Sequence, residues 1–223
     1  MKRKIITTGD GSTTIQIEEW NEQYHSIYGA IQESNHVFIK HGLFEVFKTN
    51  LDTINLLEIG FGTGLNAFIT CLEAEKEKRS INYVGVEGYP IYQEEIEQLN
   101  YTDLLSNNST TYFESIHKVP WEAPHKIHSN FVLTKRQKLF SKVEDKDCFN
   151  LIYFDAFGAK AQPELWTKAI FEIMFNALKK DGILVTYAAK GSVRRAMQAV
   201  GFTVERLEGP PGKREMLRAR KLC

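Results

Sequence analysis

Residues 55–66 have the sequence Asn55-Leu56-Leu57-Glu58-Ile59-Gly60-Phe61-Gly62-Thr63-Gly64-Leu65-Asn66. An apolar run ends at Glu58, alternate glycines follow, and a helical spacing of apolar residues begins at Leu65. This order predicts a strand, a tight loop and a helix. Because glycine has no Cβ, the loop can take positive φ angles and let a ligand lie against its backbone at the helix N-terminus. The stretch therefore predicts a cofactor-binding loop.

The spacing of the glycines narrows the choice of ligand. A nicotinamide or flavin loop needs a third small residue where Leu65 stands, and a P-loop needs a Gly-Lys-Ser/Thr sequence that this stretch lacks. On the motif alone, a glycine-rich turn that binds nothing remains an alternative. A second strand pattern over residues 81–87 ends in Glu87, where α/β folds place the acid that hydrogen-bonds a ribose. Two signals at this spacing favour a nucleotide-type cofactor.

The spacing of Glu58 and the three glycines resembles motif I of class I S-adenosylmethionine (SAM) methyltransferases. That cofactor carries a cationic amino-acid tail and a sulfonium in place of a pyrophosphate, which suits an acidic strand end beside the glycines. The resemblance implies that SAM contacts the loop and the end of the second strand. The implied cofactor-binding residues are Glu58, Gly60, Phe61, Gly62, Thr63, Gly64, Asn66, Glu87 and Gly88.

The length and composition favour a single ordinary globular unit. The chain has 223 residues, of which 43% are hydrophobic and 25% charged, so neither disorder nor a membrane protein is indicated. No apolar stretch approaches the roughly 20 residues that span a bilayer. Glycines at positions 9 and 11 interrupt the basic N-terminus before a signal-peptide core could form. We therefore expect a cytoplasmic protein that does not engage membranes.

The cysteines and histidines give no sign of a metal site. The three cysteines show no C-x-x-C spacing and the six histidines no H-x-x-x-H pair. We expect no bound metal.

Basic residues are concentrated at the C-terminal end of a chain whose formal net charge is zero. Residues 186–223 contain nine Lys/Arg and three Asp/Glu, which gives 9 − 3 = +6 there and −6 over the remainder. Such asymmetry indicates an anionic partner, although a solvated basic surface would give the same pattern.

Residues 1–50 precede the first core strand, and we interpret them as a separate N-terminal elaboration. Gly9-Asp10-Gly11 predicts a hairpin between two short strands. Residues 24–39 are rich in hydroxyl, histidine and aromatic side chains and have no clean amphipathic period. This composition suits either the lining of a site or an ordinary capping segment.

Residues 51–223 alternate strand and helix patterns and form the predicted methyltransferase domain. Helices are expected over 65–78 and 163–180, and further strands over 131–134, 149–155, 183–187, 202–207 and 215–219. The alternation predicts an α/β, Rossmann-like fold with a mostly parallel sheet of seven strands. The short link at 209–212 means that one of the last two strands is antiparallel, as the last strand is in class I methyltransferases.

Asp155 is the predicted catalytic residue. It ends the buried strand pattern 149–155 and has apolar neighbours in Phe154, Ala156 and Phe157. Ligands of open α/β sheets bind outside the carboxyl ends of the strands, so Asp155 and the glycine loop should share one edge. A simpler role for Asp155, capping the following turn, remains the alternative.

Several further blocks resemble one family closely. They are Asp155-Ala156-Phe157 with Lys160, Pro163, Glu164 and Trp166; Gly191-Ser192-Val193-Arg194-Arg195 with Gly201-Phe202; Gly212-Lys213-Arg214-Glu215-Met216; and parts of residues 24–38. The chain resembles the methyltransferase half of the bacterial bifunctional tRNA-modifying enzyme MnmC, a family that also includes the stand-alone form MnmD. The resemblance implies N-methylation of 5-aminomethyl-2-thiouridine at the tRNA wobble position, giving 5-methylaminomethyl-2-thiouridine.

The resemblance also implies roles for individual residues. Asp155 would orient the amine and accept its proton, and the uridine would lie among Tyr24, Ser26 and Glu33. Phosphates near the anticodon would contact Lys190, Arg194, Arg195, Lys213 and Arg214. The chain carries no flavin-dependent oxidase half in this interpretation.

One departure from the family and several alternatives remain. The family's third-strand block often carries an acid that reads the adenine, but the nearest stretch here is 134–138, so Gln137 or a backbone group would take that role. Other readings are a methyltransferase or aminopropyltransferase acting on a small amine or another RNA, and a SAM-binding module without catalysis. The paired basic motifs argue against a polyamine substrate.

Overall fold

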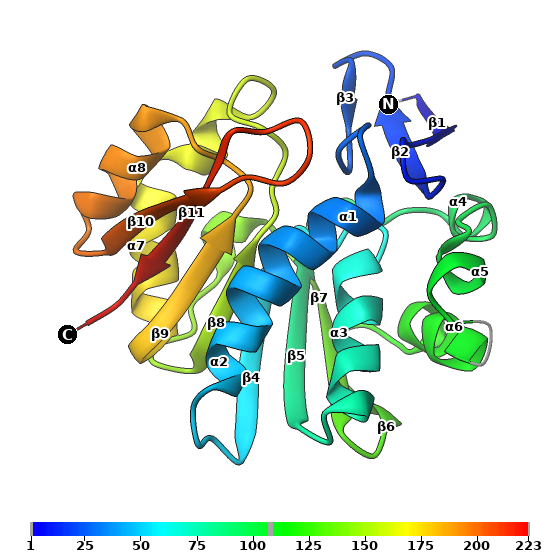
Figure 1. Ribbon diagram of the computed structural model, residues 1–223, viewed down its shortest axis with the longest axis horizontal. Coiled ribbons are helices and arrows are strands. Elements are labelled where there is room, and N and C mark those ends of the chain that lie inside the picture. The colour runs from blue at the N-terminus through cyan, green and yellow to red at the C-terminus, as the bar shows by residue number, and fades with distance from the viewer. Residues whose placement is uncertain (1, 107–108, 223) are drawn as a thin grey trace.

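The protein is described here by a computed structural model covering residues 2–106 and 109–222. Its centre is an eight-stranded sheet with the order β10-β11-β9-β8-β4-β5-β7-β6 (Figure 1). The strands are β4 (Thr53–Ile59), β5 (Ser80–Glu87), β6 (Pro124–His128), β7 (Phe131–Gln137), β8 (Phe149–Phe154), β9 (Leu178–Thr186), β10 (Thr203–Glu208) and β11 (Glu215–Arg220).

The α/β class and the antiparallel last strand are confirmed. Strands β7, β5, β4, β8 and β9 are parallel, and β11 runs antiparallel to both of its neighbours, β9 and β10. The expectation of seven strands was wrong by one for the described part of the chain, because β6 pairs antiparallel with β7 at the sheet edge. Its sequence, Pro-His-Lys-Ile-His, lacks alternating apolar residues, since an edge strand with no fully buried residue does not need them.

Helices cover both faces of the sheet. One face carries α1 (Ala30–Ser34), the π-helical η1 (Asn35–Leu43), α2 (Phe44–Phe47), α3 (Leu65–Lys76) and α6 (Thr110–Lys118), and the other carries α7 (Lys168–Ala177) and α8 (Gly191–Gln198). The short helices α4 (Gln93–Ile96), α5 (Tyr101–Leu105), η3 (Phe140–Lys142) and η4 (Pro163–Trp166) lie in connections.

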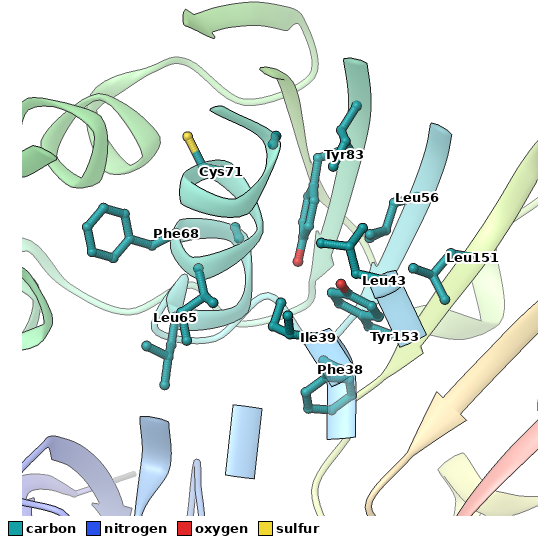
Figure 2. Packing of buried hydrophobic residues seen from close by; sticks show 14 of the residues in the cluster. Phe38, Ile39, Leu43, Leu56, Leu65, Phe68, Cys71, Tyr83, Leu151 and Tyr153 are labelled. Carbon is teal, nitrogen blue, oxygen red and sulfur yellow. The ribbon is translucent and has the colours of Figure 1, made fainter. Parts of the chain in front are cut away.

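The core on the first face joins the N-terminal segment to the sheet. Figure 2 shows Phe38 and Leu43 of η1 beside Tyr153 of β8, with the ring centroids of Phe38 and Tyr153 5.1 Å apart. Leu56 of β4 and Tyr83 of β5 are also fully buried in this cluster. Residues 30–47 therefore form one continuous helical run packed on the sheet. The sequence did not predict this helix, because its π-helical stretch buries the consecutive residues 37–39, and this breaks the 3.6-residue period of apolar positions that indicates a helix.

The N-terminal hairpin is confirmed and gains a third strand. β1 (Arg3–Thr7) pairs antiparallel with β2 (Thr13–Ile17), and β2 pairs with β3 (Glu22–Gln23). This small sheet lies beyond the carboxyl ends of the parallel strands, on the same side of the molecule as the loop between β10 and β11 (Figure 1). Two distant parts of the chain thus frame one edge of the main sheet.

The helix expected over 163–180 was wrong in its extent. The chain forms η4 and then α7, which ends at Ala177, and β9 begins at Leu178. Leu178 pairs with Phe149 of β8, so a long-range strand contact overrides the local helical pattern.

Candidate active site

The loop between β4 and α3 has the backbone that its glycines predict. Gly60, Gly62 and Gly64 have φ angles of 91°, 48° and 73°, all in the left-handed region. A Cβ on Gly60 would lie 2.5 Å from the carbonyl oxygen of Asp155, so the loop passes directly beside the end of β8. The Gly62 N–H donates to Glu87 Oε2 at 3.0 Å, which joins the loop to the end of β5.

A cavity of about 670 Å³ opens at this edge of the sheet. Its size lies within the roughly 300–1,000 Å³ of small-molecule sites. It brings together twelve of the residues singled out from the sequence. They are Tyr24, Ser26, Glu33, Gly60, Phe61, Gly62, Thr63, Asn66, Glu87, Gly88, Asp155 and Lys213.

Asn66 organises the acidic end of the cavity. Its Nδ2 donates to Glu58 Oε1 and to Asp155 Oδ2, both at 2.9 Å, and its Oδ1 accepts from the Ser34 hydroxyl. The Glu58 carboxyl is fully buried, does not line the cavity, and also accepts from the Tyr83 hydroxyl at 2.7 Å. Burial also holds the pKa of Glu58 well above its usual range. Because the Glu58 side chain lies outside the cavity and accepts a hydrogen bond from Asn66, it positions Asn66.

The Asp155 carboxyl is a weaker acid than an ordinary aspartate carboxyl. Burial raises the pKa of Asp155 to about 8, and the nearby Glu33 carboxylate adds to the rise. The Asn66 hydrogen bond and the Lys213 ammonium both lower it. A carboxyl with this pKa can accept a proton near neutral pH, as catalytic bases do.

Glu33 and Lys213 meet beside Asp155. Lys213 Nζ forms an ion pair with Glu33 Oε1 and lies 3.8 Å from the ring centroid of Tyr187. The other Glu33 oxygen accepts the Ser26 N–H at 2.8 Å. The Tyr187 hydroxyl donates to the Ala156 carbonyl at 2.8 Å, which fixes the ring against the β8 end.

The opposite end of the cavity has the features of a nucleoside pocket. Glu87 Oε1 accepts the Tyr89 N–H at 2.9 Å, and Gly88 and Tyr89 continue along the wall. Residues 139–141 close this side. Gln137 ends β7 with an exposed side chain and does not line the cavity, so residues 139–141 are better placed to contact an adenine than Gln137.

Besides Phe61, aromatic residues form much of the wall, and of these only Tyr24 was assigned to the site from the sequence. The rings of Tyr24 and Phe157 meet edge to face with centroids 4.9 Å apart, and Trp20 packs on Phe157 at 5.7 Å. Tyr28 and Tyr187 also line the cavity. Tyr187 directly follows β9, so the strand-end rule that located Asp155 could have located Tyr187 as well.

The basic residues singled out from the sequence separate into groups. Lys190 and Arg214 line a second hollow of about 770 Å³, which Lys160 and Arg206 also border and which shares Lys213 with the main cavity. Two acids, Glu22 and Glu215, line it as well, and Glu215 pairs with Arg206 at 3.7 Å. Arg194 and Arg195 of α8 line neither hollow, and Gly64 faces His117 outside the main cavity. Lys160 and Arg206 were not assigned to this surface from the sequence, and the fold adds them to it.

No group of three or more His, Cys, Asp or Glu side chains suited to a metal ion occurs within residues 2–106 and 109–222. Over the same described ranges, no helix combines the length and apolar character needed to cross a bilayer.

Two similar curated proteins carry the same name, MnmC. The chain is 28% identical over 95% of its length to the tRNA 5-methylaminomethyl-2-thiouridine biosynthesis bifunctional protein MnmC of Leptospira interrogans, covering 34% of that protein. It is 26% identical over 92% of its length to MnmC of Burkholderia multivorans, covering 33% of it. The chain thus spans about a third of the length of these relatives.

Solved structures agree on the fold. MnmC2 from Aquifex aeolicus matches all of this chain and 70% of its own, with a TM-score of 0.80 and 23% identity. Spermidine synthase from Thermotoga maritima matches 99% of this chain and 69% of its own, with a TM-score of 0.60 and 12% identity. At these identities the likeness establishes the architecture.

The sequence model of one family matches residues 98–222, which is more than half of the chain, and its description is S-adenosyl-L-methionine-dependent methyltransferase. The positive-φ glycines and Glu87 suit that cofactor, because they leave backbone accessible beside a carboxylate that can bind a ribose. The chain therefore belongs to the S-adenosyl-L-methionine-dependent methyltransferase family, and S-adenosyl-L-methionine is its cofactor.

Proposed function

We propose that the protein methylates the primary amine of 5-aminomethyl-(2-thio)uridine at the wobble position of tRNA, giving 5-methylaminomethyl-(2-thio)uridine. One observation carries the proposal: the cavity of a SAM-dependent methyltransferase holds two neighbouring carboxyl groups, those of Asp155 and Glu33, and adjoins a hollow bordered by more cations than acids. The carboxylates suit a cationic amine, and the cations suit the phosphates of a nucleic acid. The name of the MnmC relatives supports the same substrate.

Cofactor binding is assigned to the glycine loop and the end of β5. S-adenosyl-L-methionine supplies an activated methyl group on a positively charged sulfur. Gly60, Phe61, Gly62 and Thr63 would hold it along the backbone, with Glu87 and its neighbour Gly88 at the ribose. Asn66 acts by orienting Asp155, through its hydrogen bond to Oδ2.

Proton handling at the amine is assigned to Asp155. A primary alkyl amine has a pKa near 10, like the lysine side chain at about 10.4, and is mostly protonated at neutral pH. The ionised form of Asp155 can hold the ammonium, align it and accept the proton that it must lose before nitrogen attacks. The uridine would lie among Tyr24, Ser26 and Glu33, so residues 1–50 act as a substrate-binding elaboration on a methyltransferase domain formed by 51–223.

RNA binding is assigned to the cationic hollow beside the main cavity. Lys160, Lys190, Arg206 and Arg214 border it, and the eight-residue helix α8 begins at Gly191 beside Lys190. Free N–H groups at a helix N-terminus add to the attraction for phosphate. The anticodon loop is single-stranded, so its wobble base can enter the cavity while its phosphates meet these cations. A tRNA substrate implies a cytoplasmic enzyme.

The test is incubation of the protein with S-adenosyl-L-methionine and tRNA from cells that lack this methylation, followed by mass analysis of the nucleosides. We expect a gain of one methyl group on the wobble aminomethyl uridine. Methyl transfer only to free small amines, or to another nucleoside of the tRNA, would contradict the proposal.

A further inference from the structure

The ammonium of Lys213 occupies the main cavity. The sequence placed Lys213 among the phosphate contacts, but its Nζ pairs with Glu33, whose side chain is only 7% exposed, and lies 3.8 Å from the Tyr187 ring centroid. A carboxylate and an aromatic face are the two groups that proteins use to bind a primary ammonium. The cavity therefore contains a built ammonium site that is filled by the chain itself.

Asp155 faces the same site. The Glu33 carboxylate raises the pKa of Asp155, and the Lys213 ammonium lowers it, so both charges lie near this carboxyl. Burial raises the pKa of Tyr187, and Asp155 and Glu33 then raise it further. Both carboxyl groups thus lie near the ring that Lys213 covers, and an amine bound between Glu33 and Tyr187 must compete with Lys213.

The loop that carries Lys213 gives its side chain a second place to go. Gly212, with φ of 82°, lies so close to Tyr28 that a Cβ there would overlap the Tyr28 ring. This contact holds the loop backbone over the cavity. Lys213 borders both the main cavity and the cationic hollow, so its flexible side chain can reach either one by changing rotamer.

We propose that the Lys213 ammonium occupies the subsite of the substrate's primary amine, between Glu33 and Tyr187 and near Asp155, and that the substrate displaces it towards the cationic hollow. The inference rests on the proposed function, because it identifies the amine subsite of that reaction. Lys213 then makes the subsite specific for cations, because only a ligand with a cationic group can replace its ammonium without leaving Glu33 buried and unpaired.

The experiment measures binding, not turnover. Calorimetry on the full chain saturated with S-adenosylhomocysteine would give the Kd of 5-aminomethyluridine and of uridine for the wild type and for Lys213→Met. We expect the variant to bind 5-aminomethyluridine about fivefold more tightly, the size of a partly exposed ion pair, with uridine unchanged. Lys180→Met, an exposed lysine near the start of β9 at the opposite edge, should match the wild type.

Salt separates displacement from a long-range charge effect. At about 1 M salt the Debye length is about 3 Å, so a gain that came from removing a charge acting through solvent over a longer distance would be largely screened. The gain from a vacated subsite persists, because the amine then pairs directly with the buried Glu33. An unchanged or weaker affinity of Lys213→Met for 5-aminomethyluridine would overturn the inference.

A second variant keeps the test decisive if Lys213→Met does not fold. Glu33→Gln removes the anion of the subsite, so the preference for 5-aminomethyluridine over uridine should fall at least fivefold. An unchanged preference would also overturn the inference. If Lys213→Met binds 5-aminomethyluridine more tightly but the protein does not methylate tRNA, the amine subsite stands and the proposed substrate is rejected. If the protein methylates tRNA but Lys213→Met does not bind 5-aminomethyluridine more tightly, only the displacement of Lys213 is rejected.

Discussion

The chemistry of Asp155 depends on its neighbours more than on its own identity. Burial and the Glu33 carboxylate raise its pKa to about 8, whereas an exposed aspartate has a pKa near 3.9. The raised pKa means that the carboxyl keeps its proton below about pH 8 and becomes a base above it. The same hydrogen bond from Asn66 that orients Asp155 also favours its ionised form.

We therefore predict that kcat/KM of the wild type rises with pH through about 8, as Asp155 in the free enzyme loses its proton. Asp155→Asn should lower kcat about 10²- to 10⁴-fold, the usual size of general-base catalysis, and abolish this rise. Steady-state kinetics over roughly two pH units on either side of about 8 would measure both effects.

Asp181→Asn is the matched control, because Asp181 lies on β9 away from the cavity with a φ of 62°, which asparagine also tolerates. Its kcat and pH profile should equal those of the wild type. If Asp155→Asn lost cofactor affinity as strongly as turnover, Asp155 would be a cofactor ligand instead of the base.

At the scale of elements, the site is made where β4, β5 and β8 end together. The glycine loop leaves β4, donates a hydrogen bond from its Gly62 N–H to Glu87 at the end of β5, and passes the Asp155 carbonyl after β8. The parallel register of these three strands brings their ends to one edge. The loop therefore fits only if no side chain separates Gly60 from β8.

Two glycine-to-alanine variants test this close approach. Gly60 and Gly11 have similar φ angles of 91° and 84°, but a Cβ on Gly60 would lie 2.5 Å from the Asp155 oxygen, and one on Gly11 would have nothing within 4 Å. Both variants incur the backbone strain of roughly 1–2 kcal/mol. Gly60→Ala should lose at least about 1 kcal/mol more stability in urea unfolding, and should lose affinity for S-adenosyl-L-methionine. Equal losses in the two variants would contradict the packing argument.

At the scale of the whole molecule, the basic C-terminal region divides between two edges of the sheet. Because β11 runs antiparallel, its first residue and the loop before it lie at the cavity edge of the sheet, and its last residues lie at the opposite edge. The cations at that opposite edge form ion pairs away from the cavity. Arg218 and Arg220 pair with Glu45 and Glu205, and Lys221 pairs with Asp147. The net charge of this region therefore overstates the surface available to RNA.

The salt dependence of tRNA binding tests this division. Replacing Lys190 or Arg214 by Ala should reduce the slope of log K against log salt by about one each, since each change removes one phosphate contact. Arg220→Gln should leave the slope unchanged, because Arg220 is held by Glu45 and Glu205 at the other edge. Filter binding of tRNA across a salt series measures all three slopes. A reduced slope for Arg220→Gln would mean that RNA also reaches the far edge.

The sequence by itself determined those features of this protein that depend on residues close together in the chain. The glycine spacing, the carboxylates that end apolar runs and the short link before Glu215 predicted the cofactor loop, the edge with Asp155 and the antiparallel last strand. Each depends on rules within a few residues, such as the φ freedom of glycine or the length of a crossover.

Only the tertiary structure decided how distant side chains pair. Glu58 turns into the core to hold Asn66, Lys213 enters the cavity to meet Glu33 from 180 positions earlier, and Arg220 is bound by Glu45. The helical run 30–47 and the edge strand β6 were also settled by packing and pairing. These outcomes depend on burial and on charges brought together across the sheet, and neither quantity can be read from the local order of residues.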